Sequence, residues 1–124
     1  MILDEKHKAY QIEDKIYHCG TSITMHYIGG KWKCIVLWYL RNGKMRFSEL
    51  KKLIPDITEK MLSLQLKSLQ KDGLVNRKVY GIKPPLRTEY SLSKFGETII
   101  PVVEIITNWG IKIGETKGDL IDVD

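Results

Sequence analysis

Apolar residues recur with helical spacing in the first half of this chain. The stretch KWKCIVLWYLRNG, residues 31–43, is apolar almost all round, as expected for a helix buried at the centre of a small domain. Asn42 and Gly43 end it with residues that tolerate the left-handed backbone conformation found after helices. A shorter helix is expected over residues 21–28, ahead of a Gly-Gly pair. Two consecutive helices are therefore predicted in this region.

Two further helices follow, joined by a short turn. RFSELKKLI, residues 46–54, has apolar residues at helical spacing, and Pro55 ends it because a proline disfavours helix at the residue before it. After the connection PDI, residues 58–72 form the best-marked helix of the chain. Thr58 suits its N-cap, and Gly73 stands where a C-cap glycine is expected. The order helix, turn, helix is thus predicted.

The helix over residues 58–72 has two chemically different faces. Placed at intervals of about 100°, Leu66 and Leu69 fall within about 40° of Leu62, and the three leucines form a core stripe. We expect this stripe in the core and the opposite face in solvent. The opposite face is cationic, with polar and apolar neighbours, and consists of Lys60, Ser63, Leu64, Lys67 and Lys71.

A β-hairpin and a long helix are predicted to complete the chain. LVNRKVY, residues 74–80, and RTEYSL, residues 87–92, alternate like half-buried strands. Pro84 and Pro85 lie between them, and because prolines cannot donate to a sheet ladder they mark and stiffen a hairpin tip. Residues 93–114 are expected to form a long helix, kinked near its proline. Its broad apolar face comprises Ile99, Val102, Val103, Ile106, Trp109 and Ile113.

The positive charge is concentrated in the middle of the chain. The 124 residues carry a net charge of +5, yet residues 41–90 hold 12 basic and 5 acidic side chains, against 5 and 4 before them and 3 and 6 after them. Such a block favours a polyanionic partner, nucleic acid before an anionic membrane, with a solvated lysine-rich face as the alternative. No apolar run approaches the ~20 residues of a membrane span and no signal peptide is evident, so we expect a cytoplasmic protein without a membrane partner.

The predicted elements describe a helix-turn-helix followed by a wing. The major groove of B-DNA, about 12 Å wide, admits one α-helix, and a hairpin beside that helix can reach the neighbouring backbone. We therefore expect an α+β, mainly α, winged helix-turn-helix fold in a single domain over residues 1–124. Its DNA-binding core would span residues 21–92, with dimerisation and terminal segments over 1–20 and 93–124. The cations of the hairpin are Arg77, Lys78, Lys83 and Arg87.

Several blocks of the sequence also resemble one protein family. IGGKWKCIVLWYL, RFSELKKLIPDITEKMLSLQLKSLQKDGLVNRKVY, PPLRTEYSLSKFG and NWG occur in the order typical of the HxlR family of bacterial winged-helix transcription regulators, relatives of MarR. The resemblance runs over residues 19–110. It implies flanking terminal dimerisation helices that join two copies into a homodimer. The dimer would bind palindromic operator DNA and repress or activate adjacent genes.

The resemblance also implies roles for individual residues. Residues 58–72 would be the recognition helix and 75–92 the wing, and Arg46 resembles a position suited to a phosphate contact. Leu64 stands where the family commonly has a polar residue, so it would touch a thymine methyl group or nothing. The apolar face of the C-terminal helix would form the dimer interface, with internal packing as the alternative. The expected DNA-binding residues are Arg46, Thr58, Lys60, Ser63, Leu64, Lys67, Lys71, Arg77, Lys78, Lys83 and Arg87.

The two cysteines have different expected roles. The family's N-terminal cysteine senses oxidants or electrophiles in some members, and Cys19 lies just ahead of a predicted helix, a position that favours the reactive thiolate. Cys19 is therefore a candidate thiol sensor, with an inert cysteine as the alternative. Cys34 lies within the apolar helix and is expected to be a buried packing residue. The histidines show no standard ligand spacing and CxxC is absent, so we expect no metal and no cofactor.

Two other classes of function compete with DNA binding. The chain has no GxSxG, P-loop, GxGxxG or HExxH motif, so we do not expect an enzyme. A winged-helix protein-interaction module would carry neutral or acidic residues on the recognition face, whereas lysines stand there. The signal stays open between an oxidant and a small-molecule effector. A cavity between the dimerisation helices and the wing domain would favour the small molecule.

Overall fold

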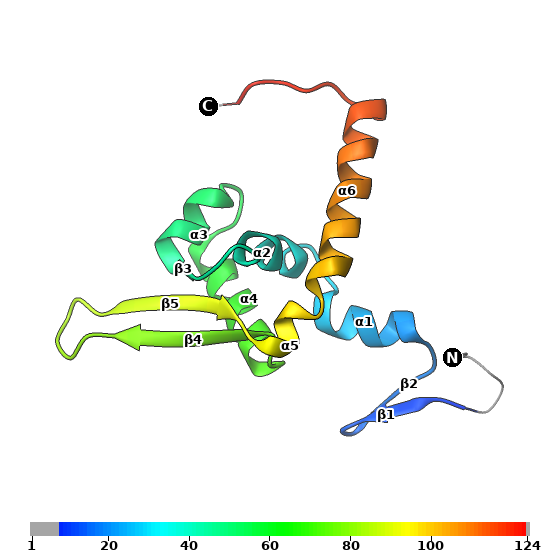
Figure 1. Cartoon of the computed structure of the whole chain (residues 1–124), viewed down its shortest axis with the longest axis horizontal. Coiled ribbons are helices and arrows are strands. Elements are labelled where there is room, and N and C mark those ends of the chain that lie inside the picture. The colour runs from blue at the N-terminus through cyan, green and yellow to red at the C-terminus, as the bar shows by residue number, and fades with distance from the viewer. Residues whose placement is uncertain (1–7, 124) are drawn as a thin grey trace.

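The computed structural model describes residues 8–123. In Figure 1 the β4–β5 hairpin projects to one side of a group of helices, α6 rises away from that group, and the β1–β2 hairpin lies at the far end. The elements in chain order are β1 (Tyr10–Ile12), β2 (Lys15–Tyr17), α1 (Gly20–Ile28), α2 (Lys33–Leu40), β3 (Met45–Arg46), α3 (Phe47–Leu53), α4 (Glu59–Lys71), β4 (Val75–Tyr80), β5 (Arg87–Leu92), α5 (Lys94–Glu97) and α6 (Ile100–Lys117).

The order of α3, α4 and the β4–β5 hairpin is that of a winged helix-turn-helix, as predicted. The turn between the two helices contains Ile54 and Ile57, which are buried at 5% and 2% exposure and fix how the helices meet. The predicted buried central helix and the leucine stripe are both confirmed. Their most buried side chains are at most 1% exposed and belong to one core cluster: Val36, Leu37, Leu40, Leu62, Leu66 and Leu69.

The sheet has three antiparallel strands in the order β3-β5-β4, so β5 is central. The predicted hairpin is present, with Val75 opposite Leu92 and Tyr80 opposite Arg87. The edge strand β3 was not predicted, because two residues are too few to show alternation. Its register places Arg46 directly opposite Glu89.

Both ends of α4 are fixed by the signals present in the sequence. The Thr58 side chain accepts a hydrogen bond from the backbone N–H of Met61 at 3.0 Å, which confirms Thr58 as the N-cap. Gly73 follows the last turn with a φ of +80°, a conformation that glycine adopts without steric cost. The backbone N–H of Leu74 then donates to the carbonyl of Leu69 at 2.9 Å and closes the helix end. Helix α4 is therefore capped at both ends by hydrogen bonds.

The C-terminal region differs from the single kinked helix that was predicted. Residues 94–97 form the short helix α5, and a separate helix, α6, starts at Ile100. Pro101 lies in the first turn of α6, where its missing N–H has no helical partner to lose. The helical run is interrupted at residues 98–99, so the break predicted near Pro101 is present, but it separates two helices and the proline begins the second one.

The N-terminal flank also differs from the prediction of terminal helices. Within residues 8–20 the chain forms the β1–β2 hairpin, with Tyr10 opposite Tyr17, before α1 begins. Glu13 in its turn has a positive φ of 54°. Residues 1–7 of the predicted N-terminal dimerisation segment lie outside the described residues. Among residues 8–123, no helix is long and apolar enough to cross a bilayer.

Candidate nucleic-acid interface

The predicted recognition face of α4 is accessible. Lys60, Lys67 and Lys71 are exposed, and the Leu64 side chain is 50% exposed, whereas the leucine stripe on the opposite side is buried. Ser63 is half-buried at the edge of this face. A helix anchored in the core by one side thus presents three ammonium groups and a hydroxyl on the other side. Such a surface can contact phosphates and the polar edges of bases.

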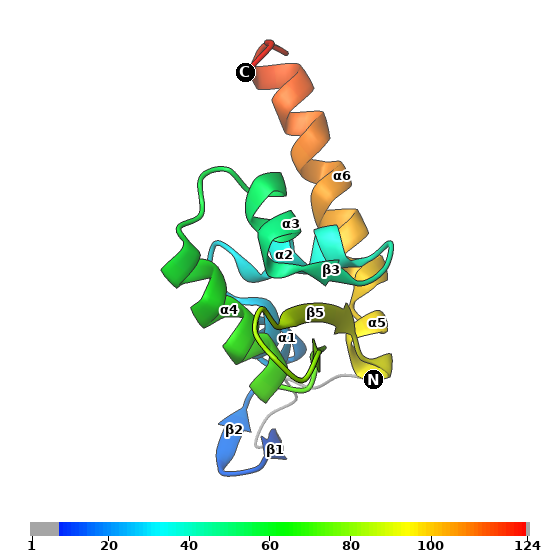
Figure 2. The same cartoon turned by 90° about the vertical axis from the view of Figure 1, so that its left-hand side faces the viewer.

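The wing lies next to α4. Helix α4 packs against β4, and Figure 2, which looks from the side of the wing tip, shows α4 and the hairpin side by side. The ring of Tyr80 has Lys78 Nζ at 4.9 Å and Arg87 Cζ at 5.1 Å from its centroid. These cation–π contacts gather two cations from opposite strands on one face of the sheet. Since successive residues of a strand point to opposite faces, Arg77 belongs to the other face.

Arg46 lies on the same face of the sheet as Lys78 and Arg87. These three residues define the cationic face of the wing. The exposed side chain of Arg46 lies beside the first turn of α3, where the Arg46 backbone N–H donates to Glu49 Oε1 at 2.8 Å. A groove of ≈ 430 Å³ separates this turn from the wing tip. The groove is lined by Arg46, Phe47, Ser48, Pro85, Leu86, Arg87 and Thr88. Lys83 stands at the exposed tip of the hairpin.

The sequence did not single out two residues of this face. Lys44 Nζ lies 3.7 Å from Glu89 Oε1, and Arg87 Nε lies 3.8 Å from Glu89 Oε2. Lys44 stands just before β3, and Glu89 is in the central strand, so only the unpredicted third strand brings them together. The alternation of β5 was the one available signal, because it places Glu89 on the face opposite the buried Tyr90.

The apolar face of α6 that was expected to form the dimer interface is exposed in part. Val102, Ile106 and Trp109 are 38%, 43% and 67% exposed, and Ile99 and Ile113 are half-buried. Val103 is a correction: it is 1% exposed and belongs to the core cluster, where α6 packs against α2. Sequence reasoning also missed Ile105, which is 70% exposed on the same side of α6 as Val102 and Trp109, whereas Ile111, 54% exposed, lies about half a turn away from them. The exposed apolar stripe is therefore rotated away from Val103.

Cys19 and Cys34 are both partly exposed. Cys19 is the N-cap residue of α1, as its position before a predicted helix implied, and its Sγ lies 3.7 Å from Ser22 Oγ. Cys34 packs against the core from α2 but is half-buried, less than was predicted, with Sγ 3.9 Å from the carbonyl oxygen of Ile28. Burial raises the pKa of the Cys34 thiol.

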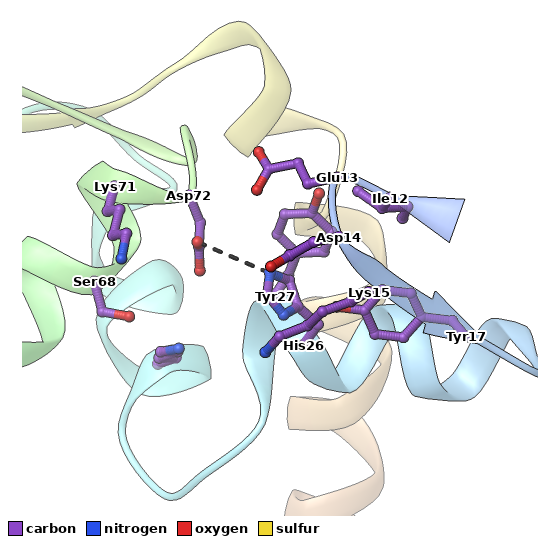
Figure 3. A pocket seen from close by; sticks show the side chains of 11 residues that line it. Ile12, Glu13, Asp14, Lys15, Tyr17, His26, Tyr27, Ser68, Lys71 and Asp72 are labelled. Atoms are coloured by element: carbon purple, nitrogen blue, oxygen red, sulfur yellow. Dashed lines mark ion pairs between the residues drawn. The ribbon is translucent and has the colours of Figure 1, made fainter. Parts of the chain in front are cut away.

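A second hollow lies at the C-terminal end of α4. The pocket, of ≈ 550 Å³, is enclosed by the β1–β2 turn, α1, the start of α2 and the last turn of α4. Figure 3 shows Ser68, Lys71 and Asp72 of the α4 end facing Glu13 and Asp14 of the hairpin turn, with His26 and Tyr27 between them. His26 Nε2 lies 3.9 Å from Asp72 Oδ1, which makes an ion pair when the imidazole is protonated.

A third hollow, of ≈ 450 Å³, lies between α6 and the wing domain, where a cavity was considered in advance, and is lined by residues of α2, β5, α5 and α6. The pocket beside the N-terminal hairpin is separate from it. Its lining mixes three lysines with three carboxylates. Over residues 8–123, no group of His, Cys, Asp and Glu side chains is arranged to hold a metal ion.

Known proteins are similar to this chain in sequence and in structure. The HTH-type transcriptional regulator YtcD of Bacillus subtilis is 43% identical over 113 residues, which cover 90% of this chain and 89% of YtcD. The structure of the redox regulator HypR in its oxidized form matches with a TM-score of 0.71 and 42% identity, covering 82% of this chain and 100% of HypR. The reduced form of HypR matches with the same TM-score and 43% identity, over 75% of this chain and 91% of HypR.

These similarities fit the winged helix-turn-helix described above, and the relatives are regulators and not enzymes. The model of the HxlR-like helix-turn-helix family matches residues 27–117, from the end of α1 to the end of α6. The chain therefore belongs to the HxlR-like helix-turn-helix family, as the sequence blocks implied.

Proposed function

We propose that the protein is a homodimeric transcription regulator that binds a palindromic operator in double-stranded DNA. The observation that carries this proposal is α4, whose leucine face is buried while its opposite face presents Lys60, Lys67 and Lys71 to solvent. A helix of this kind fits the major groove, which is about 12 Å wide. Membership of a family whose relatives are helix-turn-helix regulators supports the proposal.

Residues 21–92 would form the DNA-binding core, in which α4 contacts mainly bases and the wing contacts mainly the DNA backbone. Lys60, Ser63, Leu64 and Lys67 of α4 would face the bases. Because phosphate contacts fix position while base contacts carry sequence information, the remaining cations would set the register of the protein on the duplex. These backbone contacts are Arg46, Lys71, Lys78, Lys83 and Arg87, with Thr58 capping the helix at the groove and Arg77 exposed on the face of the wing that carries Tyr90.

Dimerisation would occur through α6. Soluble monomers rarely expose a contiguous apolar patch of more than a few hundred Å², and the exposed isoleucines and Trp109 of α6 lie along one long helix. Two copies of α4 related by a two-fold axis would suit palindromic half-sites about 34–36 Å, one turn of DNA, apart. Such a regulator would act in the cytoplasm, on DNA close to its own gene.

The test is a binding measurement by fluorescence anisotropy at about 0.15 M salt. One duplex is the region upstream of the protein's own gene, and the control is a scrambled duplex of equal length. We expect a preference of about 10³-fold or more for the upstream region. Equal, weak binding to that duplex and to tiled neighbouring promoter duplexes would favour the alternative, a winged-helix protein-interaction module that does not recognise DNA.

A thiol signal is the second candidate property, and the HypR similarity favours it. HypR is a redox regulator with both an oxidized and a reduced form, and Cys19 of this chain lies partly exposed at the start of α1. We expect an oxidant to change operator affinity in the wild type and in Cys34→Ser but not in Cys19→Ser. An oxidant response that survives in Cys19→Ser would exclude Cys19 as the sensor. The hollow between α6 and the wing domain supports the other signal, a small-molecule effector.

A further inference from the structure

One carboxylate lies at the centre of the cationic face of the wing. Glu89 occupies the central strand β5, with Arg46 of β3 opposite it on one side and Lys78 of β4 opposite it on the other. Directly opposed residues of antiparallel strands point to the same face, and so do residues two apart in one strand, such as Arg87 and Glu89. Four cations, Lys44, Arg46, Lys78 and Arg87, thus surround a single acid.

The carboxylate of Glu89 is largely buried and poorly satisfied. Its side chain is 14% exposed, and its Oε1 atom has no hydrogen-bond partner. Lys44 Nζ and Arg87 Nε approach the two carboxylate oxygens to 3.7 and 3.8 Å, close enough for electrostatic attraction but too far for a hydrogen bond. A buried, unsatisfied charge is not a device for stabilising a fold, because a neutral side chain of the same shape avoids the desolvation cost. Its position among the cations therefore points to a role in binding.

We propose that Glu89 is a positioning residue for DNA binding: it holds Arg87 at the rim of the groove between α3 and the wing tip, and Lys44 at the neighbouring hollow beside α6, so that both cations receive backbone phosphates. This inference rests on the proposed DNA-binding function. Arg46, Ser48 and Arg87 line that groove, so two guanidinium groups and a hydroxyl border the same space. A long cationic side chain loses rotamer entropy when it is fixed by a phosphate, and a carboxylate that fixes it beforehand lowers that cost.

The cluster also retains charge for a phosphate. Four cations around one acid leave an excess of three positive charges, so Glu89 orders the group without neutralising it. Two hypotheses predict opposite effects of losing Glu89 on DNA affinity. Simple Coulomb attraction predicts tighter DNA binding when a negative charge is removed, whereas a positioning role predicts weaker binding.

The variant Glu89→Gln separates these two outcomes because it keeps the shape of the side chain and raises the net charge by one. Affinity is measured on a mixed-sequence duplex of about 30 base pairs over a series of salt concentrations, since phosphate contacts do not depend on sequence. We expect Glu89→Gln to bind roughly three- to tenfold more weakly at low salt, with the slope of log K against log salt reduced by about one. Equal or tighter binding would overturn the proposal.

The matched control is Glu97→Gln, which adds the same charge at an exposed position of α5. We expect it to leave the salt slope unchanged. Circular dichroism and the thermal midpoint verify that both variants fold. If wild-type protein itself shows no salt-dependent binding to any duplex, the proposed function fails. If the wild type binds and Glu89→Gln behaves like Glu97→Gln, only the role of Glu89 is refuted.

A second variant tests the same cluster without touching a buried atom. Lys44 is exposed, so Lys44→Ala should fold normally, and we expect it to reduce the salt slope by about one. In addition, Glu89→Gln should cost less affinity in the Arg87→Ala background than in the wild type, because part of its effect passes through Arg87. Full additivity of Glu89→Gln and Arg87→Ala, with no effect of Lys44→Ala, would contradict the proposal.

Discussion

Thr58 Oγ1 accepts a hydrogen bond from the backbone N–H of Met61 at 3.0 Å, at the start of α4, the helix with the exposed lysines. Replacing Thr58 by alanine leaves that N–H without its partner in the fold. We expect Thr58→Ala to lower the free energy of unfolding by about 1 kcal/mol, and Thr58→Ser to lower it by much less, since serine caps equally well. Urea denaturation of the three proteins measures the difference. Equal losses for alanine and serine would mean that the hydroxyl does not stabilise the helix.

Gly96 packs directly on the backbone where the wing begins. A Cβ atom at this position would lie 2.0 Å from the carbonyl oxygen of Leu74, so the backbone must move to admit any side chain. We expect Gly96→Ala to destabilise the fold by roughly 2–3 kcal/mol. The control is Gly114→Ala in α6, where no atom lies within 4 Å of an added Cβ. That variant should be neutral or slightly more stable, because alanine favours helix. Thermal denaturation that ranks the two variants the other way would contradict the structure.

Helix α4 was predictable because all its local signals agree. Thr58 and Gly73 mark the ends of α4, the leucines recur at helical spacing, and the lysines fall on the opposite side. Each of these signals lies within the helix itself and does not depend on the rest of the fold.

Features that depend on distant partners were not predictable in the same way. The strand β3 exists only because Met45 and Arg46 pair with β5, more than forty positions along the chain. Val102 and Val103 are adjacent apolar residues of one helix, and the packing of α6 on α2 decides that Val103 is the buried one. The neighbours of Glu89 depend on the pairing register of all three strands β3, β5 and β4. The sequence therefore predicted the helix-turn-helix and the wing, but not the arrangement of charges between them.

Cys34 is expected to react slowly with thiol reagents in the folded protein. Burial raises its pKa above the ordinary value of 9.0, because desolvation penalises the thiolate, which is the reactive form. At about pH 8, iodoacetamide should therefore alkylate Cys34 more slowly in native protein than in urea-unfolded protein, as followed by mass spectrometry of the peptides.

The same shift also affects stability at high pH. The folded state favours the neutral thiol, so this contribution is fully present below the unfolded pKa and is lost as the pH rises through the folded value. The decline should be absent in Cys34→Ala. Faster alkylation of Cys34 in the native state would show that the thiol is not shielded.

Trp109 should be central to dimer formation. Its side chain is 67% exposed on the apolar stripe of α6, so a substitution there can disturb association without opening the core. We expect Trp109→Glu to shift the protein toward the monomer in sedimentation velocity, because a charge at the centre of an apolar interface is costly to desolvate. Asn108→Glu places the same charge at the neighbouring exposed position and should have a smaller effect. An unchanged sedimentation coefficient for Trp109→Glu would place the interface elsewhere.

Lys67 and Lys83 should affect DNA binding in different ways. Lys67 is exposed in the middle of α4, where it would reach base edges, whereas Lys83 stands at the wing tip, where it would meet the backbone. We expect Lys67→Ala to cost about 1–3 kcal/mol on the operator and to relax sequence preference. Lys83→Ala should weaken binding to the operator and to scrambled DNA alike, and should reduce the salt slope by about one. Both variants are compared by fluorescence anisotropy on the two duplexes. If both lose the same affinity on operator and scrambled DNA, then α4 does not read bases through Lys67, and the recognition face must be sought on another side of the helix.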